Sequence, residues 1–341
     1  MSFSKKNKGS ILILVMWMIM LGLILVTAIA ANIRLSATTV IHHQEALQDW
    51  SATLETLNKA YMELVIDNMP KIKAQKTSLY NRESEENRFD GRPLKLSYNT
   101  PEDMTVRIYD LSGKLNITRL SQKKLTQLLE QQLGEGNKKI AERVDAWFDW
   151  IDKDNLKRLN GAEAAYYKRE KSGYTPRNGV FTSVDEIRLI KGFTDMFPDI
   201  ELNTVFTLWG NVSGSVNPNI ASKETLLLLP GMTESIADKL INARKTNYFK
   251  SMAEINVHLT PIAATKLAGW FQFSKSGFYA IVVYPSAIEG NQKENDKAPQ
   301  TIYAYMEEVS VAGRPKKPVI LRVNPYAKVV IEHRGSNSAD Q

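Results

Sequence analysis

The fold is decided by residues 11–31, ILILVMWMIMLGLILVTAIAA, a stretch that contains no charged residue. As a helix it is about 31 Å long, which is enough to cross the hydrocarbon core of a bilayer. Lys5, Lys6 and Lys8 precede the stretch, and the first charge after it is Arg34. The positive-inside rule therefore predicts a cytoplasmic N-terminus, with most of the chain on the other side of the membrane.

A cleaved secretory signal peptide is the first alternative to a retained membrane anchor. The apolar region of such a peptide is usually about 7–15 residues long, and this one is longer. The sequence also has no clear small-x-small cleavage site before the helical pattern resumes. We therefore interpret residues 11–31 as a helix that stays in the membrane.

The helical pattern continues past the membrane-length segment, up to about residue 67. Apolar residues at helical spacing form one stripe, and Pro70 ends the pattern. We predict a single helix of roughly 85 Å over residues 11–67, whose outer half packs on the chain's own folded domain. A dimeric coiled coil is the alternative, but the stripe spans fewer than four heptads and His43 interrupts it. The stripe consists of Val40, Leu47, Trp50, Leu54, Leu57, Tyr61, Leu64 and Val65.

Period-two patterns typical of strands occur on both sides of a long segment with helical patterns. We expect strands at 104–109, 114–118, 277–284, 301–309 and 319–323. This arrangement predicts an α+β protein in which an all-α block is inserted into one antiparallel sheet. Residues 71–103, including the polar run 81–93, are predicted to be loop, as are 289–300. Residues 334–341 are expected to form a disordered tail.

The helical block contains weak internal repeats that are typical of helix–hairpin–helix units. Ser183 and Ser251 each begin a Ser-x-x-Glu capping box, and residues 226–244 come near the DNA-binding form of the motif. That form needs a second glycine to bring backbone N–H groups to a phosphate, and Thr233 stands there instead. No basic surface accompanies the motif, so we interpret these units as hairpins that pack helices together.

Acidic residues are concentrated in one short segment of the helical block, at Asp145, Asp149, Asp152, Asp154 and Glu163. Several carboxylates at a helix end and in the following loop could surround a hard cation, since calcium binds six to eight oxygens. The spacing is not that of an EF-hand. Because Lys153, Lys157 and Arg158 lie among the acids, a solvated acidic face is the alternative on composition alone.

The composition argues against most catalytic chemistries. The 341 residues include no cysteine, which rules out disulfides, thiol nucleophiles and thiolate zinc sites. Four scattered histidines, with no nucleophile elbow and no phosphate loop, give no catalytic constellation, so we expect no enzyme activity. The formal net charge of +7 is not gathered in a Lys/Arg block, so no nucleic-acid partner is expected.

The junction Lys8-Gly9-Ser10, a basic leader and a glycine before an apolar helix, resembles the leader of type IV prepilins and type II secretion pseudopilins. In those families a peptidase cuts after the glycine, so the resemblance implies cleavage between Gly9 and Ser10. Leu14 replaces the glutamate that most members have at the fifth mature position. That departure is typical of one branch, the minor pseudopilin K of type II secretion.

Further motifs along most of the chain are similar to this pseudopilin K family. They are 110–117 (DLSGKLNI), 149–154 (DWIDKD), 160–163 (NGAE), 166–167 (YY), 176–179 (PRNG), 183–187 (SVDEI) and 216–219 (VNPN). The resemblance implies a pilin-like fold with a large helical insertion and a calcium ion held by Asp149, Asp152, Asp154 and Glu163. Other members often carry further acids after the glutamate, where this chain has Ala164 and Ala165.

The resemblance also implies a domain plan and a function. The plan is a leader at 1–9, an N-terminal helix at 10–67 with its transmembrane part at 11–31, a sheet domain at 68–118 and 274–330, an inserted helical domain at 119–273 containing helix–hairpin–helix-like units, and a tail at 331–341. The implied function is a minor pseudopilin that caps the periplasmic pseudopilus and assists export of folded proteins across the outer membrane. Its partners would be other minor pseudopilins, met through the N-terminal helix and the pilin domain, the prepilin peptidase and the inner-membrane assembly platform. The main domain would be periplasmic on a single-pass inner-membrane anchor.

Two other functions stay open on the sequence. One is a minor pilin of a type IV pilus or DNA-uptake system, which shares the leader and the long helix. The other is a membrane-tethered DNA-binding protein that uses the helix–hairpin–helix units, for which salt-dependent binding of DNA would be the signature.

Overall fold

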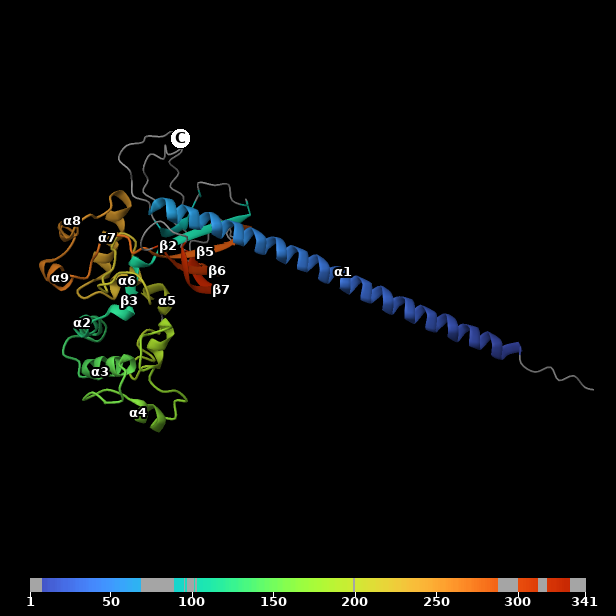
Figure 1. Ribbon diagram of the computed structural model, residues 1–341, viewed down its shortest axis with the longest axis horizontal. Coiled ribbons are helices and arrows are strands. Elements are labelled where there is room, and N and C mark those ends of the chain that lie inside the picture. The colour runs from blue at the N-terminus through green and yellow to red at the C-terminus, as the bar shows by residue number, and fades with distance from the viewer. Residues whose placement is uncertain are drawn as a thin grey trace, which may run out of the picture. The chain divides into compact units, whose positions relative to one another are not determined.

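The computed structural model describes residues 8–68, 89–94, 96, 101, 103–198, 200–287, 300–311 and 318–331. The chain forms two compact units, 1–55 and 56–341, and each is described by itself. Helix α1 (Lys8–Asp67) supplies nearly all of the described part of the first unit (Figure 1). By length and composition α1 is apolar enough to cross a membrane, and its large apolar side chains from Leu12 to Ile33 are exposed.

One antiparallel sheet with the strand order β1-β2-β5-β6-β7 forms the frame of the second unit. The central strands are aligned so that Ile108, Ile281 and Glu307 lie opposite one another. β5 is buried along almost its whole length, because both faces of the sheet are covered there. The strands are β1 (Asp90–Pro93), β2 (Met104–Asp110), β5 (Phe278–Pro285), β6 (Gln300–Ser310) and β7 (Val319–Ile331).

The last turns of α1 pack on this sheet within the second unit (Figure 1). Leu57 and Leu64 on the predicted stripe are buried, and each such side chain contributes about 1.5–3 kcal/mol. The Tyr61 hydroxyl donates a hydrogen bond to Glu307 on β6, and Asp67 pairs with Lys275 at 2.6 Å. The second unit thus has the α+β, pilin-like arrangement that the sequence predicted.

Between β2 and β5 the chain forms a separate block around its own hydrophobic core, which includes Trp147, Trp150, Phe193 and Trp270. This confirms that a largely helical block interrupts one antiparallel sheet. Its helices are α2 (Gln122–Leu133), α3 (Lys139–Ile151), α4 (Ala164–Arg169), α5 (Leu202–Val205), α6 (Lys223–Leu227), α7 (Glu234–Thr246), α8 (Met252–Asn256) and α9 (Pro261–Lys266), together with the 3-10 helices η2 (Leu111–Gly113), η3 (Ile117–Arg119) and η4 (Val184–Leu189).

Two predictions about the strands were wrong in detail. The strand expected at 114–118 is reduced to β3 (Leu115–Asn116), because the Asn116 side chain accepts the Thr118 N–H at 3.0 Å and starts η3. β3 pairs in parallel with β4 (Phe206–Thr207), so it belongs to the inserted block, which is therefore not all-α.

β1 lies in a stretch that was predicted to be loop. Phe89 is buried and packs edge-to-face on Tyr279, with ring centroids 5.3 Å apart, and this contact brings the short segment to the edge of the sheet. The predicted loops at 71–88 and 289–299 and the predicted tail at 334–341 lie outside the described residues, whereas Gln300 begins β6.

Candidate metal centre

The candidate centre lies where α3 ends and the chain turns back. α3 is strongly amphipathic, and its apolar face, with Val144, Trp147 and Trp150, is buried in the core of the inserted block. The helix ends at Ile151, because Asp152 adopts an extended conformation and only caps the last turn. The loop that follows therefore begins two residues after the buried Trp150.

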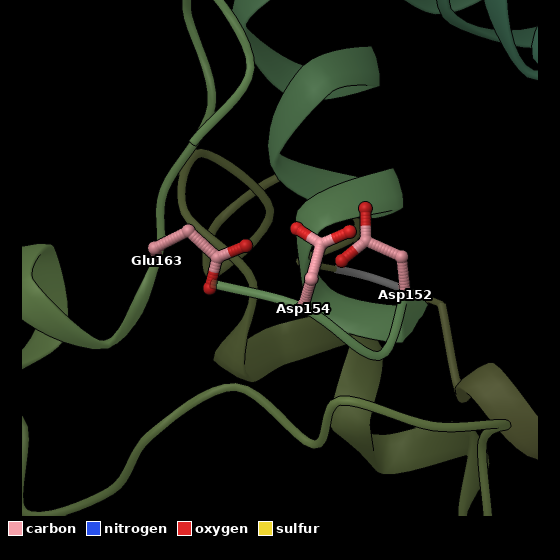
Figure 2. A group of neighbouring side chains, drawn as sticks. All are labelled: Asp152, Asp154 and Glu163. Carbon is pink, nitrogen blue, oxygen red and sulfur yellow. The ribbon is translucent and has the colours of Figure 1, made fainter. Parts of the chain in front are cut away.

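Three of the predicted ligands come together at this turn. Asp152, Asp154 and Glu163 each offer one carboxylate oxygen, and these oxygens all lie within 4.8 Å of one another. Figure 2 shows the three side chains converging, two from the turn after α3 and Glu163 from the returning segment. Because calcium binds oxygens at about 2.3–2.6 Å, oxygens on opposite sides of one ion lie roughly 5 Å apart. The spacing of the three carboxylates suits a single hard cation.

Glu163 supplies an independent sign that a cation fits here. Its side chain is only 4% exposed, and among the described residues neither of its carboxylate oxygens has a hydrogen-bond partner. Burial, followed by the negative charges of Asp149 and Asp152, raises the pKa of Glu163 to about 7. A buried carboxylate without partners is costly, and a bound cation would remove that cost. The residues present therefore fit a calcium ion.

Asp149, the fourth predicted ligand, does not join this group of oxygens. It is fully buried, it accepts the Arg158 N–H at 3.3 Å, and it pairs with the Arg158 guanidinium at 3.3 Å. Gly161 passes so close that a Cβ atom there would lie 2.6 Å from the Asp149 Cγ. The structure thus uses Asp149 to hold the returning segment against α3.

Asp145, which also belongs to the acidic segment, anchors the same loop one turn earlier on α3. Its Oδ2 accepts hydrogen bonds from the backbone N–H and the side-chain amide of Asn160, at 3.0 and 3.1 Å. The acidic segment therefore separates into two roles. Asp145 and Asp149 accept hydrogen bonds from the backbone of the returning segment, whereas Asp152, Asp154 and Glu163 bring their carboxylates together.

Asn178 is a further residue of this site to which the sequence assigned no role. Its Nδ2 donates to the carbonyl of Asp154 at 3.3 Å and to Asn155 Oδ1 at 3.2 Å, and its Oδ1 is buried without a hydrogen-bond partner among the described residues. The residue has a φ of 50°, a left-handed conformation that asparagine tolerates better than most residues. The Asn-Gly pair at 178–179 was the local signal for that conformation.

The helix–hairpin–helix segment has no free phosphate-binding turn. The Gly231 N–H, which a DNA-binding hairpin would direct at a phosphate, donates to Gln131 Oε1 at 2.9 Å. Arg244 is buried and donates to the carbonyls of Pro218 and Ala221, at 2.8 and 2.6 Å. Both groups hold the inserted block together, in agreement with a packing role.

The predicted capping boxes behave differently from each other. At Ser183 both halves of the box form, and it opens η4. At Ser251 the side chain makes no cap hydrogen bond, and Glu254 accepts the Lys250 N–H instead, at 2.8 Å. The predicted cleavage residues Gly9 and Ser10 lie at the start of α1.

A long N-terminal helix whose last turns pack on an antiparallel sheet, together with a helical block that interrupts this sheet, defines a pilin-like α+β protein. A comparison with solved structures agrees. A chain of the GspK–GspI–GspJ complex from the type 2 secretion system of enterotoxigenic Escherichia coli matches with a TM-score of 0.54, over 84% of this chain and 98% of that chain. At 13% identity this likeness shows the fold alone.

The family is indicated by sequence. Residues 108–198, which include the whole acidic segment, match the family model of protein K of the type II secretion system. Two curated relatives carry that name, one from Pseudomonas aeruginosa (26% identical, covering 48% of this chain and 50% of the relative) and one from Klebsiella pneumoniae (30% identical, covering 38% and 40%). The alignments span half of those relatives or less. The resemblance to the protein K family is therefore confirmed.

Proposed function

We propose that this chain is a minor pseudopilin of a type II secretion system, which caps the tip of a periplasmic pseudopilus and assists export of folded proteins across the outer membrane. The observation that carries the proposal is the match to the protein K family of residues 108–198, which run from the end of β2 into the block inserted in a pilin-like fold. The role is one of assembly and involves no catalysis.

Membrane anchoring follows from α1. Its apolar first half would cross the inner membrane once, with Lys5, Lys6 and Lys8 on the cytoplasmic side and the second unit in the periplasm. The prepilin peptidase and the inner-membrane assembly platform would be the partners of this part of the chain.

The tip position is supported by Leu14. In a pilin-like filament, a glutamate at this place neutralises the N-terminal amine of the next subunit in apolar surroundings, where an unpaired charge is expensive. This chain has no carboxylate there, so it is poorly suited to repeat along a shaft. The block inserted between β2 and β5 also supports a position at the tip, because a bulky insertion is easier to place at the end of a filament than in its helical lattice.

Calcium is part of the proposal. Asp152, Asp154 and Glu163 would hold one ion, which would supply positive charge to carboxylates that otherwise repel one another. Asp145 and Asp149 would position the loop through its backbone. The ion would be structural, fixing the loop that follows α3.

Processing of the N-terminus is the first expected result. If a prepilin peptidase cuts after Gly9, mass spectrometry of the mature protein from cells should find Ser10 as the first residue, with the apolar helix retained. A Gly9→Ala variant, whose added methyl group should hinder the peptidase, is expected to keep the leader. A mature chain that begins near residue 30 would contradict the proposal, since it would show that the helix is removed as a signal peptide.

Assembly is the second expected result. Full-length protein extracted from cells that express the neighbouring pilin-like genes should co-purify with two or three smaller pseudopilins. This expectation is supported by the structural neighbour, which belongs to a GspK–GspI–GspJ complex. Cross-linking should place the chain once per filament, at an end. Cross-links between copies of this chain at regular intervals along a shaft would refute the tip assignment.

A further inference from the structure

The loop after α3 carries two leucines that are almost fully exposed. Leu156 is 79% exposed and Leu159 is 90% exposed, which is unusual for leucine in a well-formed block. Val180, 75% exposed, lies on a second segment that is bonded to this loop through Asn178 and Asn155, at 3.2 Å. We call residues 153–160, together with Val180, the apical loop.

Hydrogen bonds to α3 and within the loop hold the apical loop in this conformation. Its far end is tied to α3 by the hydrogen bonds from Arg158 N–H to Asp149 and from Asn160 N–H to Asp145. Its near end is closed by a hydrogen bond from Leu156 N–H to Asp154 Oδ1, at 2.8 Å. The two leucines are therefore exposed on a backbone that these hydrogen bonds hold in place.

Within residues 153–160 the charged and apolar side chains follow in the order Lys153, Asp154, Leu156, Lys157, Arg158, Leu159, so three cations and one carboxylate accompany the two leucines. Lys153 and Lys157 are exposed, and neither makes an ion pair with the residues that the structure describes. The Arg158 side chain is 42% exposed, and its guanidinium is shared between Asp149 and Asp152. Two lysines beside the leucines are thus available to an anionic partner.

We propose that the apical loop docks on an anionic lipid surface, with Leu156 and Leu159 entering the boundary between head groups and acyl chains and Lys153 and Lys157 contacting lipid phosphates. Apolar side chains interleaved with lysines are the pattern that binds such interfaces, and each cation near an anionic leaflet adds to the attraction. The inference stands on the geometry of this loop and on its own charged and apolar side chains, and it does not depend on the pseudopilus.

A protein partner fits the loop less well. Specific protein interfaces bury roughly 800 Å² on each side and have an apolar centre depleted of charge. The apical loop instead offers three separate exposed apolar side chains, with Lys157 between Leu156 and Leu159. The head-group and acyl-chain boundary of a lipid bilayer is fluid, so separate apolar side chains can insert into it without a complementary pocket.

The test uses the full chain with α1 embedded in a phosphatidylcholine nanodisc. Because α1 cannot then insert into added vesicles, only the rest of the protein can bind them. Vesicles of phosphatidylethanolamine and phosphatidylglycerol should capture the loaded nanodiscs on flotation, whereas phosphatidylcholine vesicles should not. The double variant Leu156→Ser/Leu159→Ser should bind about tenfold more weakly or worse. Each substitution removes the favourable free energy of transferring a leucine side chain from water to the lipid interface. The matched control is Val257→Ser/Ile262→Ser, which removes two other exposed apolar side chains, 78% and 71% exposed, and should bind as the parent.

The absence of cysteine gives a second, direct readout. A single Leu159→Cys substitution can be labelled with an environment-sensitive dye, whose emission should shift to the blue with anionic vesicles and be quenched by spin-labelled lipids. The same dye on Val257→Cys should not respond. The proposal is overturned if anionic vesicles fail to capture the chain or if both double variants lose binding equally. It is also overturned if the dye at residue 159 shows neither a blue shift with anionic vesicles nor quenching by spin-labelled lipids.

Discussion

Gly161→Ala is expected to lower the melting temperature of the inserted block by about 6–12 °C. A Cβ atom at this position would lie 2.6 Å from the Asp149 Cγ and closer still to one of its carboxylate oxygens. Asp149 cannot retreat, because it is fully buried on α3 next to Trp150 and holds the Arg158 N–H. Overpacking of this kind costs about 3 kcal/mol, and each kcal/mol corresponds to about 2–4 °C in a domain of this size.

Tryptophan fluorescence of the full chain during thermal unfolding is the measurement, since Trp147 and Trp150 lie in the core beside the strained turn. Gly179→Ala is the matched control in the same site. An added Cβ there meets nothing closer than 3.9 Å, so its effect should stay within about 0.5 kcal/mol. Equal melting temperatures for Gly161→Ala and the parent chain would show that Asp149 does not hold the loop as described.

The parts of the fold that the sequence predicted are those fixed by local pattern. The apolar run that became α1, the period-two patterns of β2, β5, β6 and β7, and the Ser183 capping box each carry their signal within a few residues. β1 could not be predicted in this way. Its only strong signal is Phe89, whose burial depends on Tyr279, a residue nearly two hundred positions away in the chain.

The candidate centre was predicted only as a set of acids. Spacing identified the carboxylates, but it could not separate Asp145 and Asp149, which hold the returning segment, from the three whose oxygens gather together. That separation depends on the returning segment, where Gly161 allows close approach to Asp149 and the Glu163 carboxylate has no hydrogen-bond partner among the described residues. The structural role of Arg244 could not be predicted from local sequence either, because it donates hydrogen bonds to two carbonyl groups more than twenty residues away in the chain.

The pH dependence of stability should reverse when calcium is added. In the metal-free protein, Glu163 has a pKa of about 7, compared with 4.5 in an ordinary environment, so the folded state keeps a proton that the unfolded state has lost. The stability that this proton provides is complete below pH 4.5 and is lost as the pH rises to 7. In the presence of chelator, the melting temperature should therefore fall over this window through the contribution of Glu163.

Calcium acts in the opposite direction, because only the deprotonated carboxylate is a ligand. The stabilisation by calcium should grow as the pH rises through 7, reaching about 2.7 kcal/mol at a hundredfold excess over Kd. The measurement is the difference in melting temperature between calcium and chelator, recorded at intervals from pH 5.5 to 8. Asp152→Ala should abolish this difference at every pH, because it removes one of the three gathered oxygens.

Glu163→Gln isolates the titrating group. The amide is uncharged at every pH, so the variant should lose both the calcium stabilisation and the fall of metal-free stability between pH 4.5 and 7. Glu170→Gln is the matched control, since Glu170 is exposed at the end of α4 and its ion pair with Arg169, at 3.4 Å, is also exposed. It should behave as the parent chain. Equal melting temperatures with calcium and with chelator at pH 8 would remove calcium from the proposed function, and an unchanged pH profile in Glu163→Gln would show that another group titrates.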